Sequence, residues 1–345
     1  MRSHLLQHRL PQLGLVLLVV LLGLAPAARA QDKAELEAQS RALQRASNAV
    51  LGVKAQAVEE ARSSRTLGRE REGSGVVIDA QGLVLTIGYL ILEAEQVLLV
   101  TDDDREIPGR VVGYDIATGF GLVQPLVPLR IEPAPLGESA RVRDDEPLMI
   151  ASGGEGGAVS VARLVSRRPF AGYWEYHIEG ALFTAPARRD HSGAGLFNGR
   201  GELVGVGSLY VQNARGSEQP RVQGNMFVPV DLLRPVLDEL KRSGTTAASR
   251  RAWLGISCSE EDGQLRIIRV SDDSPADVAG LQEGDRILRI DGKQVSALDQ
   301  LWLTLWRGGA AEREVTLEVQ RRDRTETFKV YSVDRAKTLK RSQGV

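Results

Sequence analysis

The most reactive-looking feature of this sequence is a serine placed among small residues. Ser192 follows Asp190 and His191 and precedes Gly193-Ala194-Gly195, and the glycines favour a tight turn around it. A serine hydroxyl attacks a carbonyl carbon only when a base accepts its proton and an acid orients that base. The segment therefore indicates acyl-transfer chemistry, provided that other residues serve Ser192.

The two neighbours of Ser192 are poor candidates for that base. Adjacent side chains on a tight turn diverge, and no acid in the sequence is placed to orient the ring of His191. Asp190 would be a solvated carboxylate, which is too weak a base to deprotonate an alcohol. We therefore expect that neither residue activates Ser192.

Metal and cofactor chemistry has no support in the sequence. Beyond residue 30 only His177 and His191 remain, and no histidine or cysteine cluster has the spacing of metal ligands. The acidic run over residues 102–104 lacks the glycine and glutamate of a calcium loop and predicts a solvated hairpin tip. Cys258 is the single cysteine, so it forms no internal disulfide, and we expect a partly buried thiol on a strand.

The N-terminus has the layout of a secretory signal peptide. Arg2 and Arg9 precede an apolar run from Leu13 to Ala25, and Ala28-Arg29-Ala30 forms an A-x-A cleavage site. A run of 13 residues is shorter than the roughly 20 that a membrane-spanning helix needs. The pattern predicts cleavage after residue 30 and a periplasmic or secreted protein; a retained signal anchor is the rival interpretation.

Composition favours packed domains without a strongly charged partner. Hydrophobic residues make up 42% of the 345-residue chain, which is typical of folded proteins. Removal of residues 1–30 takes away three arginines, so 44 basic residues become 41 against 45 acidic ones and the net charge is −4. Charges of both signs are mixed throughout, and we therefore expect neither a nucleic-acid partner nor, after signal cleavage, a membrane span.

Helical and extended patterns divide the chain before residue 242. Residues 33–48 have helical periodicity, residues 50–58 read as a first strand, and the polar run 61–72 predicts a mobile loop. From Gly73 onward, short β-branched strands are broken by glycines at close intervals. This pattern is typical of a β-barrel or a β-sandwich.

A small, polar linker over residues 242–251 separates a second unit. Residues 298–306 carry an apolar stripe at helical spacing, which predicts a helix. In residues 315–319 every second residue is apolar and expected to face inward, and a turn near residues 322–324 follows, which predicts a hairpin. The last ten residues, 336–345, are basic and polar and predict a frayed tail. The helical stripe is formed by Leu298, Leu301, Trp302, Leu305 and Trp306.

Several segments in order resemble the HtrA/Deg family of chymotrypsin-like serine proteases over about 170 residues. They are Gly73-Ser74-Gly75-Val76-Val77-Ile78-Asp79, Leu83-Val84-Leu85-Thr86-Ile87-Gly88-Tyr89-Leu90-Ile91, Asp115-Ile116-Ala117-Thr118-Gly119-Phe120-Gly121-Leu122-Val123, Leu136-Gly137-Glu138-Ser139, Ser192-Gly193-Ala194-Gly195-Leu196-Phe197-Asn198, Gly201-Glu202-Leu203-Val204-Gly205-Val206 and Phe227-Val228-Pro229-Val230. The resemblance implies a double β-barrel with Ser192 at the position of the nucleophile.

The same resemblance implies that the catalytic triad is incomplete. Tyr89 stands where the family has its histidine base, and Gly119 stands where it has the orienting aspartate. A phenol has a pKa near 10 and stays protonated at neutral pH, and glycine has no side chain. Asp190 stands where the family has the glycine whose amide helps to form the oxyanion hole, so a carboxylate lies beside the site meant for negative charge.

The second unit resembles a PDZ domain, a β-fold with two helices. The segment Ser274-Pro275-Ala276, followed by residues 279–292, is similar to the family's S-P-A…G-L-x-x-G-D-x-I-x-x-I-D-G pattern. The family's Φ-Φ-G-Φ loop is matched by Trp253, Leu254, Gly255 and Ile256. The resemblance implies that an extended peptide adds a strand beside this segment and that loop amides receive its terminal carboxylate.

Taken together, these patterns predict a mainly β protein with six segments. They are a signal peptide (1–30), an N-terminal helix and first strand (31–63), a protease-like double barrel (64–241), a linker (242–251), a PDZ domain (252–335) and a tail (336–345). We expect an HtrA-like pseudoprotease that binds unfolded proteins or peptides with free apolar C-termini, as a scaffold, sensor or regulator in protein quality control. The resemblance also implies homotrimers through the N-terminal segment.

Two other hypotheses stay open at this point. The chain could be an active serine endopeptidase with a non-standard arrangement around Ser192, although Tyr89 and Gly119 argue against it. It could also be a partner subunit that assembles with an active homologue. A covalent serine probe separates the first of these from the pseudoprotease.

Overall fold

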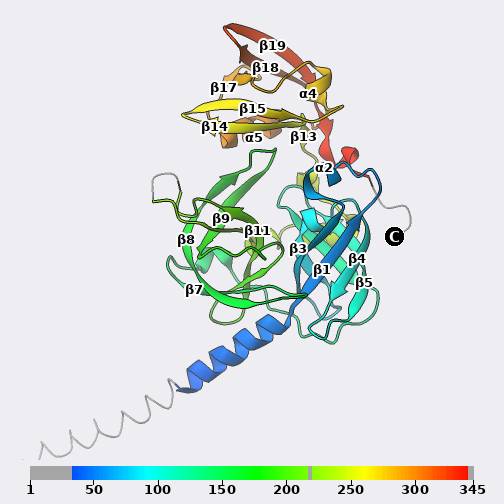
Figure 1. The fold of residues 1–345 in the computed structure, drawn as a ribbon, viewed down its shortest axis with the longest axis vertical. Coiled ribbons are helices and arrows are strands. Elements are labelled where there is room, and N and C mark those ends of the chain that lie inside the picture. The colour runs from blue at the N-terminus through cyan, green and yellow to red at the C-terminus, as the bar shows by residue number, and fades with distance from the viewer. Residues whose placement is uncertain (1–32, 217–219, 341–345) are drawn as a thin grey trace, which may run out of the picture.

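The computed structural model describes residues 33–216 and 220–340. The predicted signal peptide and the last five residues of the tail lie outside these ranges. A helix runs over residues 33–48, as the periodicity predicts, and Figure 1 shows it projecting from the barrels. Only its C-terminal end is buried, where Ala46 and then Ala49 pack into the core. None of the helices in the described ranges is both long and apolar enough to cross a membrane.

The first barrel closes in the strand order β1-β2-β3-β6-β5-β4. The polar run 61–72, predicted as a mobile loop, instead contains the short helix α2 (Ser64–Leu67) and the start of a strand. The acidic residues 102–104 lie at a hairpin tip between β4 and β5, as predicted. The strands are β1 (Val50–Ala57), β2 (Glu70–Val77), β3 (Val84–Ile87), β4 (Ala94–Val100), β5 (Glu106–Tyr114) and β6 (Phe120–Pro125).

The second barrel closes in the order β10-β11-β12-β9-β8-β7, which confirms the predicted double barrel. One apolar core includes buried residues from both barrels, so the junction between them is packed rather than open. The strands are β7 (Pro147–Ala151), β8 (Val159–Ala171), β9 (His177–Ala185), β10 (Gly195–Phe197), β11 (Leu203–Val211) and β12 (Gly224–Pro229).

The segment predicted as a linker packs against the first barrel and is not a free connection between the domains. It begins within the helix α3 (Leu237–Ser243) and includes a turn of 3-10 helix at Ala247–Ser249. Thr246 and Ser249 are buried and donate their hydroxyl protons to the Asp115 carboxylate over 2.6 and 2.5 Å. Small polar side chains serve here as hydrogen-bond donors to a buried acid.

The C-terminal unit lies above the barrels in Figure 1 and has its own apolar core. Its main sheet has the order β14-β15-β16-β18-β19, with β17 paired to β16 and the strands β13 and β20 paired separately. The predicted helix and hairpin are confirmed as α5 (Leu298–Arg307), β18 (Glu314–Arg321) and β19 (Arg324–Tyr331). The other elements are β13 (Ala252–Trp253), β14 (Ile256–Glu261), β15 (Gln264–Val270), α4 (Pro275–Val278), β16 (Arg286–Ile290), β17 (Lys293–Gln294) and β20 (Val333–Asp334).

The tail is partly ordered against the first barrel. Residues 335–338 form a turn of 3-10 helix, and the Lys340 amide donates to the Glu93 carboxylate over 2.9 Å. The Lys340 ammonium also lies 3.1 Å from Glu60. The fraying predicted for residues 336–345 is therefore wrong for residues 336–340.

Candidate functional site

Ser192 lies in the connection between β9 and β10, where the two barrels meet. Its carbonyl accepts a 2.8 Å hydrogen bond from the Ser74 amide of the first barrel. Gly193 has φ +74°, and a Cβ added there would lie 1.9 Å from the Ser74 carbonyl oxygen. Glycine is therefore required next to Ser192 because no side chain fits between the barrels.

Tyr89 reaches Ser192 from the turn of 3-10 helix at Gly88–Leu90, directly after β3. Its Oη lies 2.8 Å from Ser192 Oγ and 2.8 Å from the Ser208 carbonyl oxygen. A carbonyl can only accept, so the phenol donates to Ser208 and the Ser192 hydroxyl donates to the phenol oxygen. The residues at the predicted nucleophile and base positions, Ser192 and Tyr89, are thus in contact as two hydroxyl groups in a chain of hydrogen bonds.

Burial prevents Tyr89 from acting as a base. It raises the pKa of the Tyr89 phenol to about 12, although the hydrogen bond with Ser192 acts in the opposite direction. The phenol is therefore neutral at any physiological pH and cannot take the Ser192 proton.

The space beside Gly119 is filled by a second tyrosine. Gly119 has φ +82°, and a Cβ added there would lie 2.8 Å from Tyr176 Oη. Tyr176 is buried and donates its hydroxyl proton to the Thr118 carbonyl over 2.9 Å. The backbone conformation and the Tyr176 hydroxyl together make an aspartate side chain at this position strained and crowded.

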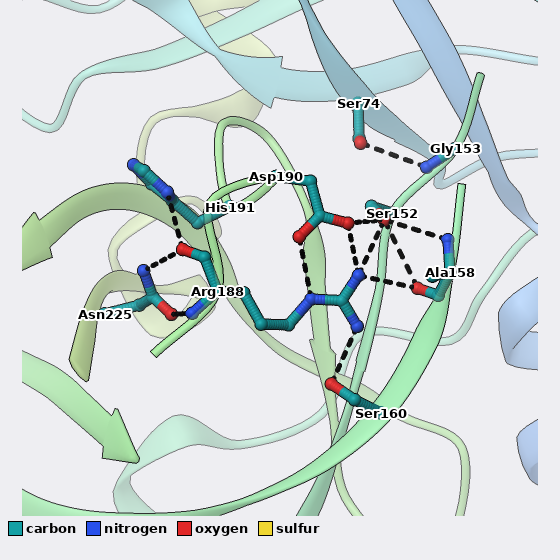
Figure 2. Close-up of polar contacts among 9 residues, drawn as sticks. All are labelled: Ser74, Ser152, Gly153, Ala158, Ser160, Arg188, Asp190, His191 and Asn225. Atoms are coloured by element: carbon teal, nitrogen blue, oxygen red, sulfur yellow. Dashed lines mark hydrogen bonds and ion pairs between the residues drawn. The ribbon is translucent and has the colours of Figure 1, made fainter. Parts of the chain in front are cut away.

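Asp190 is held by an ion pair that the sequence does not reveal. Figure 2 shows its carboxylate facing the Arg188 guanidinium and the Ser152 hydroxyl, which donates to it over 2.5 Å. Arg188 is itself fixed by the Ser160 hydroxyl at 2.7 Å and the Ala158 carbonyl at 3.1 Å. The hydrogen bond from Arg188 is the largest cause that lowers the pKa of Asp190, to about 2. An ionised carboxylate paired with an arginine therefore lies two residues before Ser192.

His191 is engaged with the backbone. Its Nδ1 lies 3.1 Å from the Arg188 carbonyl oxygen, and because a carbonyl only accepts, Nδ1 carries the proton. The Asn225 side chain donates to the same carbonyl over 2.9 Å, as Figure 2 shows. Burial lowers the pKa of His191, so the ring is neutral at pH 7. These contacts orient the imidazole toward Arg188.

The loop at Leu254 and Gly255 forms a second polar site, in the C-terminal unit. Both amides donate to one carboxylate oxygen of Glu175, over 2.9 and 3.0 Å. Glu175 is buried and comes from the connection between β8 and β9 of the second barrel. Trp253 is covered by the guanidinium of Arg62, 5.3 Å from its ring centroid. No sequence pattern pointed to Glu175.

Comparisons with known proteins agree with this architecture. Residues 73–206 match the trypsin-like peptidase domain family, and residues 252–331 match the PDZ domain family. A probable periplasmic serine endoprotease DegP-like of Pseudomonas putida is 27% identical over 72% of this chain and 54% of its own length. The corresponding protein of Pseudomonas fulva is 28% identical over 74% of this chain and 56% of its own length. The chain thus spans about half the length of these curated relatives.

Solved structures show the same fold at lower identity. The HtrA-type protease AlgW with a tripeptide aligns with a TM-score of 0.52 at 21% identity, covering 86% of this chain and 97% of its own. A serine endoprotease from Yersinia pestis gives 0.51 at 22% identity with the same coverage.

The chain therefore combines two domains. The first is a trypsin-like peptidase domain, a double barrel with a serine at the barrel junction, and the second is a PDZ domain. The two domain matches and the names of the relatives agree with the resemblance to the HtrA/Deg family.

Proposed function

We propose that this chain is an exported HtrA-type pseudoprotease that binds peptides through its PDZ domain. The observation that carries the proposal is the hydrogen bond of the Ser192 hydroxyl to the neutral phenol of Tyr89. A nucleophilic serine needs an acceptor that can hold its proton, and this one already uses its own proton on Ser208. The names of its relatives place them in the periplasm, which supports the predicted export.

The residues at positions 190 and 119 give two further reasons to expect no proteolysis. Asp190 stands at the position of the family's oxyanion-hole glycine, and its side chain is held by Arg188 and Ser152, which ties down the backbone that would have to present an amide to the oxyanion. Gly119 supplies no orienting acid, and its φ and the hydroxyl of Tyr176 disfavour one at this position. Three separate requirements for proteolysis are therefore missing.

The C-terminal unit keeps what peptide binding requires. The amides of Leu254 and Gly255 converge on a carboxylate, here that of Glu175, and β14 is the outermost strand of its sheet, where a peptide can add a strand in place of residues 172–176. This loop is the site at which the proposal places the carboxylate of a ligand, with Trp253 and Ile256 flanking it. The proposed role is recognition of unfolded or cleaved proteins as scaffold, sensor or regulator.

Amidation of a peptide ligand should weaken its binding sharply. We expect a peptide that ends in valine with a free carboxylate to bind about tenfold or more tightly than its amide, because the charge-assisted hydrogen bonds from the loop are lost. Fluorescence anisotropy with both peptides on the purified protein measures the ratio. Equal affinities would show that the loop does not receive the terminal carboxylate.

A further inference from the structure

The groove of the PDZ domain holds a segment of the same chain. Residues 172–176, here called the β8–β9 tip, connect β8 and β9 of the second barrel and contact both β14 and α5. The Cys258 amide donates to the Tyr173 carbonyl over 2.6 Å, and Trp174 forms an antiparallel bridge with Ser257. The tip therefore adds a short strand to the edge of β14.

Further contacts fix the β8–β9 tip at both ends. At the start, the indole of Trp302 on α5 donates to the Gly172 carbonyl over 2.9 Å. At the end, the Glu175 carboxylate receives the amides of Leu254 and Gly255. Trp302 is fully buried in the apolar core of the domain, so the Gly172 carbonyl is the hydrogen-bond partner of a core side chain.

The arrangement matches the pose expected of a bound peptide. Peptide capture by a PDZ domain combines strand addition at one sheet edge with a carboxylate on the loop amides. The β8–β9 tip supplies both, in the same antiparallel direction, with the Glu175 side chain in place of a terminal carboxylate. A peptide needs the same amides of Cys258, Leu254 and Gly255, so the two cannot be bound together.

We infer that the β8–β9 tip is an internal ligand of the PDZ domain, and that a peptide with a free C-terminal carboxylate binds by displacing it. The displacement of the tip by peptide rests on the peptide-binding function proposed above. The apparent affinity for peptide is then reduced by the fraction of molecules in which the tip is docked.

Desolvation of the Glu175 carboxylate opposes the contact that it makes with the loop amides. Burial raises the pKa of Glu175 to about 7, although Arg335 and the loop amides act in the opposite direction. The ionised carboxylate therefore loses more by leaving water than it regains from its partners. A terminal carboxylate that brings a full strand of backbone hydrogen bonds can compete for the same loop.

The tip also connects the groove to the altered catalytic centre. Trp174 and Tyr176 stack with their ring centroids 5.5 Å apart and an interplanar angle of 9°. Tyr176 is the residue that fills the space at Gly119. Movement of the β8–β9 tip would therefore shift Tyr176 and change its packing against Gly119 at the junction of the barrels.

Removal of the Glu175 carboxylate should open the groove. The full chain carrying Glu175→Ala should bind a fluorescein-labelled peptide ending in valine about tenfold or more tightly than the unaltered protein, because the competing internal ligand is weakened. The matched control is Glu179→Ala, which removes an exposed carboxylate from the same hairpin and should change nothing. Equal affinities for the unaltered protein and Glu175→Ala would overturn the inference.

A cross-link tests the docking of the tip without any peptide. Trp174→Cys together with Ser257→Cys, in a Cys258→Ala background, places two thiols on bridged residues, which a disulfide can span. The oxidised form should fail to bind the labelled peptide, and reduction should restore binding. If the disulfide does not form, the tip is not docked in solution and the inference is wrong. If it forms but neither the reduced form nor Glu175→Ala binds peptide, docking of the tip is supported and the proposed peptide-binding function fails instead.

Discussion

Restoring the two missing triad side chains should produce very little proteolysis. Tyr89→His together with Gly119→Asp supplies a base and its orienting acid, but the aspartate must adopt φ +82° with its Cβ 2.8 Å from Tyr176 Oη. L-residues other than glycine are strained in that conformation, and aspartate is only a partial exception. We expect casein hydrolysis by this double variant to stay close to background, and a loss of stability from the substitution at residue 119.

Activity should rise when the remaining obstacles are removed in turn. Tyr176→Phe takes away the hydroxyl that meets the new side chain, and Asp190→Gly restores the family's glycine at the oxyanion-hole position. Asp190→Gly removes the contacts to Arg188 and Ser152 and lets the amide of residue 190 turn toward the oxyanion. One oxyanion-hole donor is worth on the order of 10²–10³ in turnover, about 3–4 kcal/mol, so this substitution should give the larger gain.

Ser192→Ala in the fully repaired protein is the control for these variants and should return hydrolysis to background. Three results together would contradict this account. The unaltered protein would hydrolyse casein measurably, His191→Ala would abolish that hydrolysis, and the repair substitutions would not increase it. That pattern would establish His191 as the base and the chain as an enzyme.

Asp115→Ala should cause the largest loss of stability among single polar substitutions at the domain junction. The buried Asp115 carboxylate accepts hydroxyl protons from Thr118, Thr246 and Ser249 over 2.5–2.6 Å, and an amide proton from Thr118 over 3.1 Å. Its removal leaves several buried donors unpaired, each costing about 1–3 kcal/mol, so we expect a loss of about 3–5 kcal/mol in the free energy of unfolding.

Urea denaturation followed by tryptophan fluorescence measures this loss. Asp102→Ala is the matched control, since Asp102 is exposed at a hairpin tip, and it should change the free energy of unfolding by less than about 0.5 kcal/mol. An Asp115→Ala variant as stable as Asp102→Ala would show that the linker does not depend on this carboxylate.

Local patterns in the sequence were enough to predict most of the fold. The glycine-punctuated strands from Gly73 predict a barrel, and the stripe at residues 298–306 predicts α5, because both depend on the periodicity of a single element. The pairing of Tyr89 with Ser192 also follows from the order of motifs. These features are encoded by residues close to one another in the chain or by motif order.

The contacts that change the interpretation of the site are long-range. Tyr176 meets Thr118 across 58 residues, and Glu175 meets Gly255 across 80. The linker was expected to be free because Thr246 and Ser249 are small and polar, yet their partner Asp115 lies more than 130 residues earlier. Nothing in the local sequence identifies which buried acid such residues will serve.

Covalent labelling of Ser192 tests the central claim most directly. A fluorophosphonate or peptidyl phosphonate forms a bond with a serine only when its hydroxyl is activated. Under conditions that label an active HtrA-type protease to completion, intact mass spectrometry should find this protein unmodified. A stoichiometric adduct that peptide mapping places on Ser192 would contradict the account and show that the hydrogen bond to Tyr89 does not silence the nucleophile.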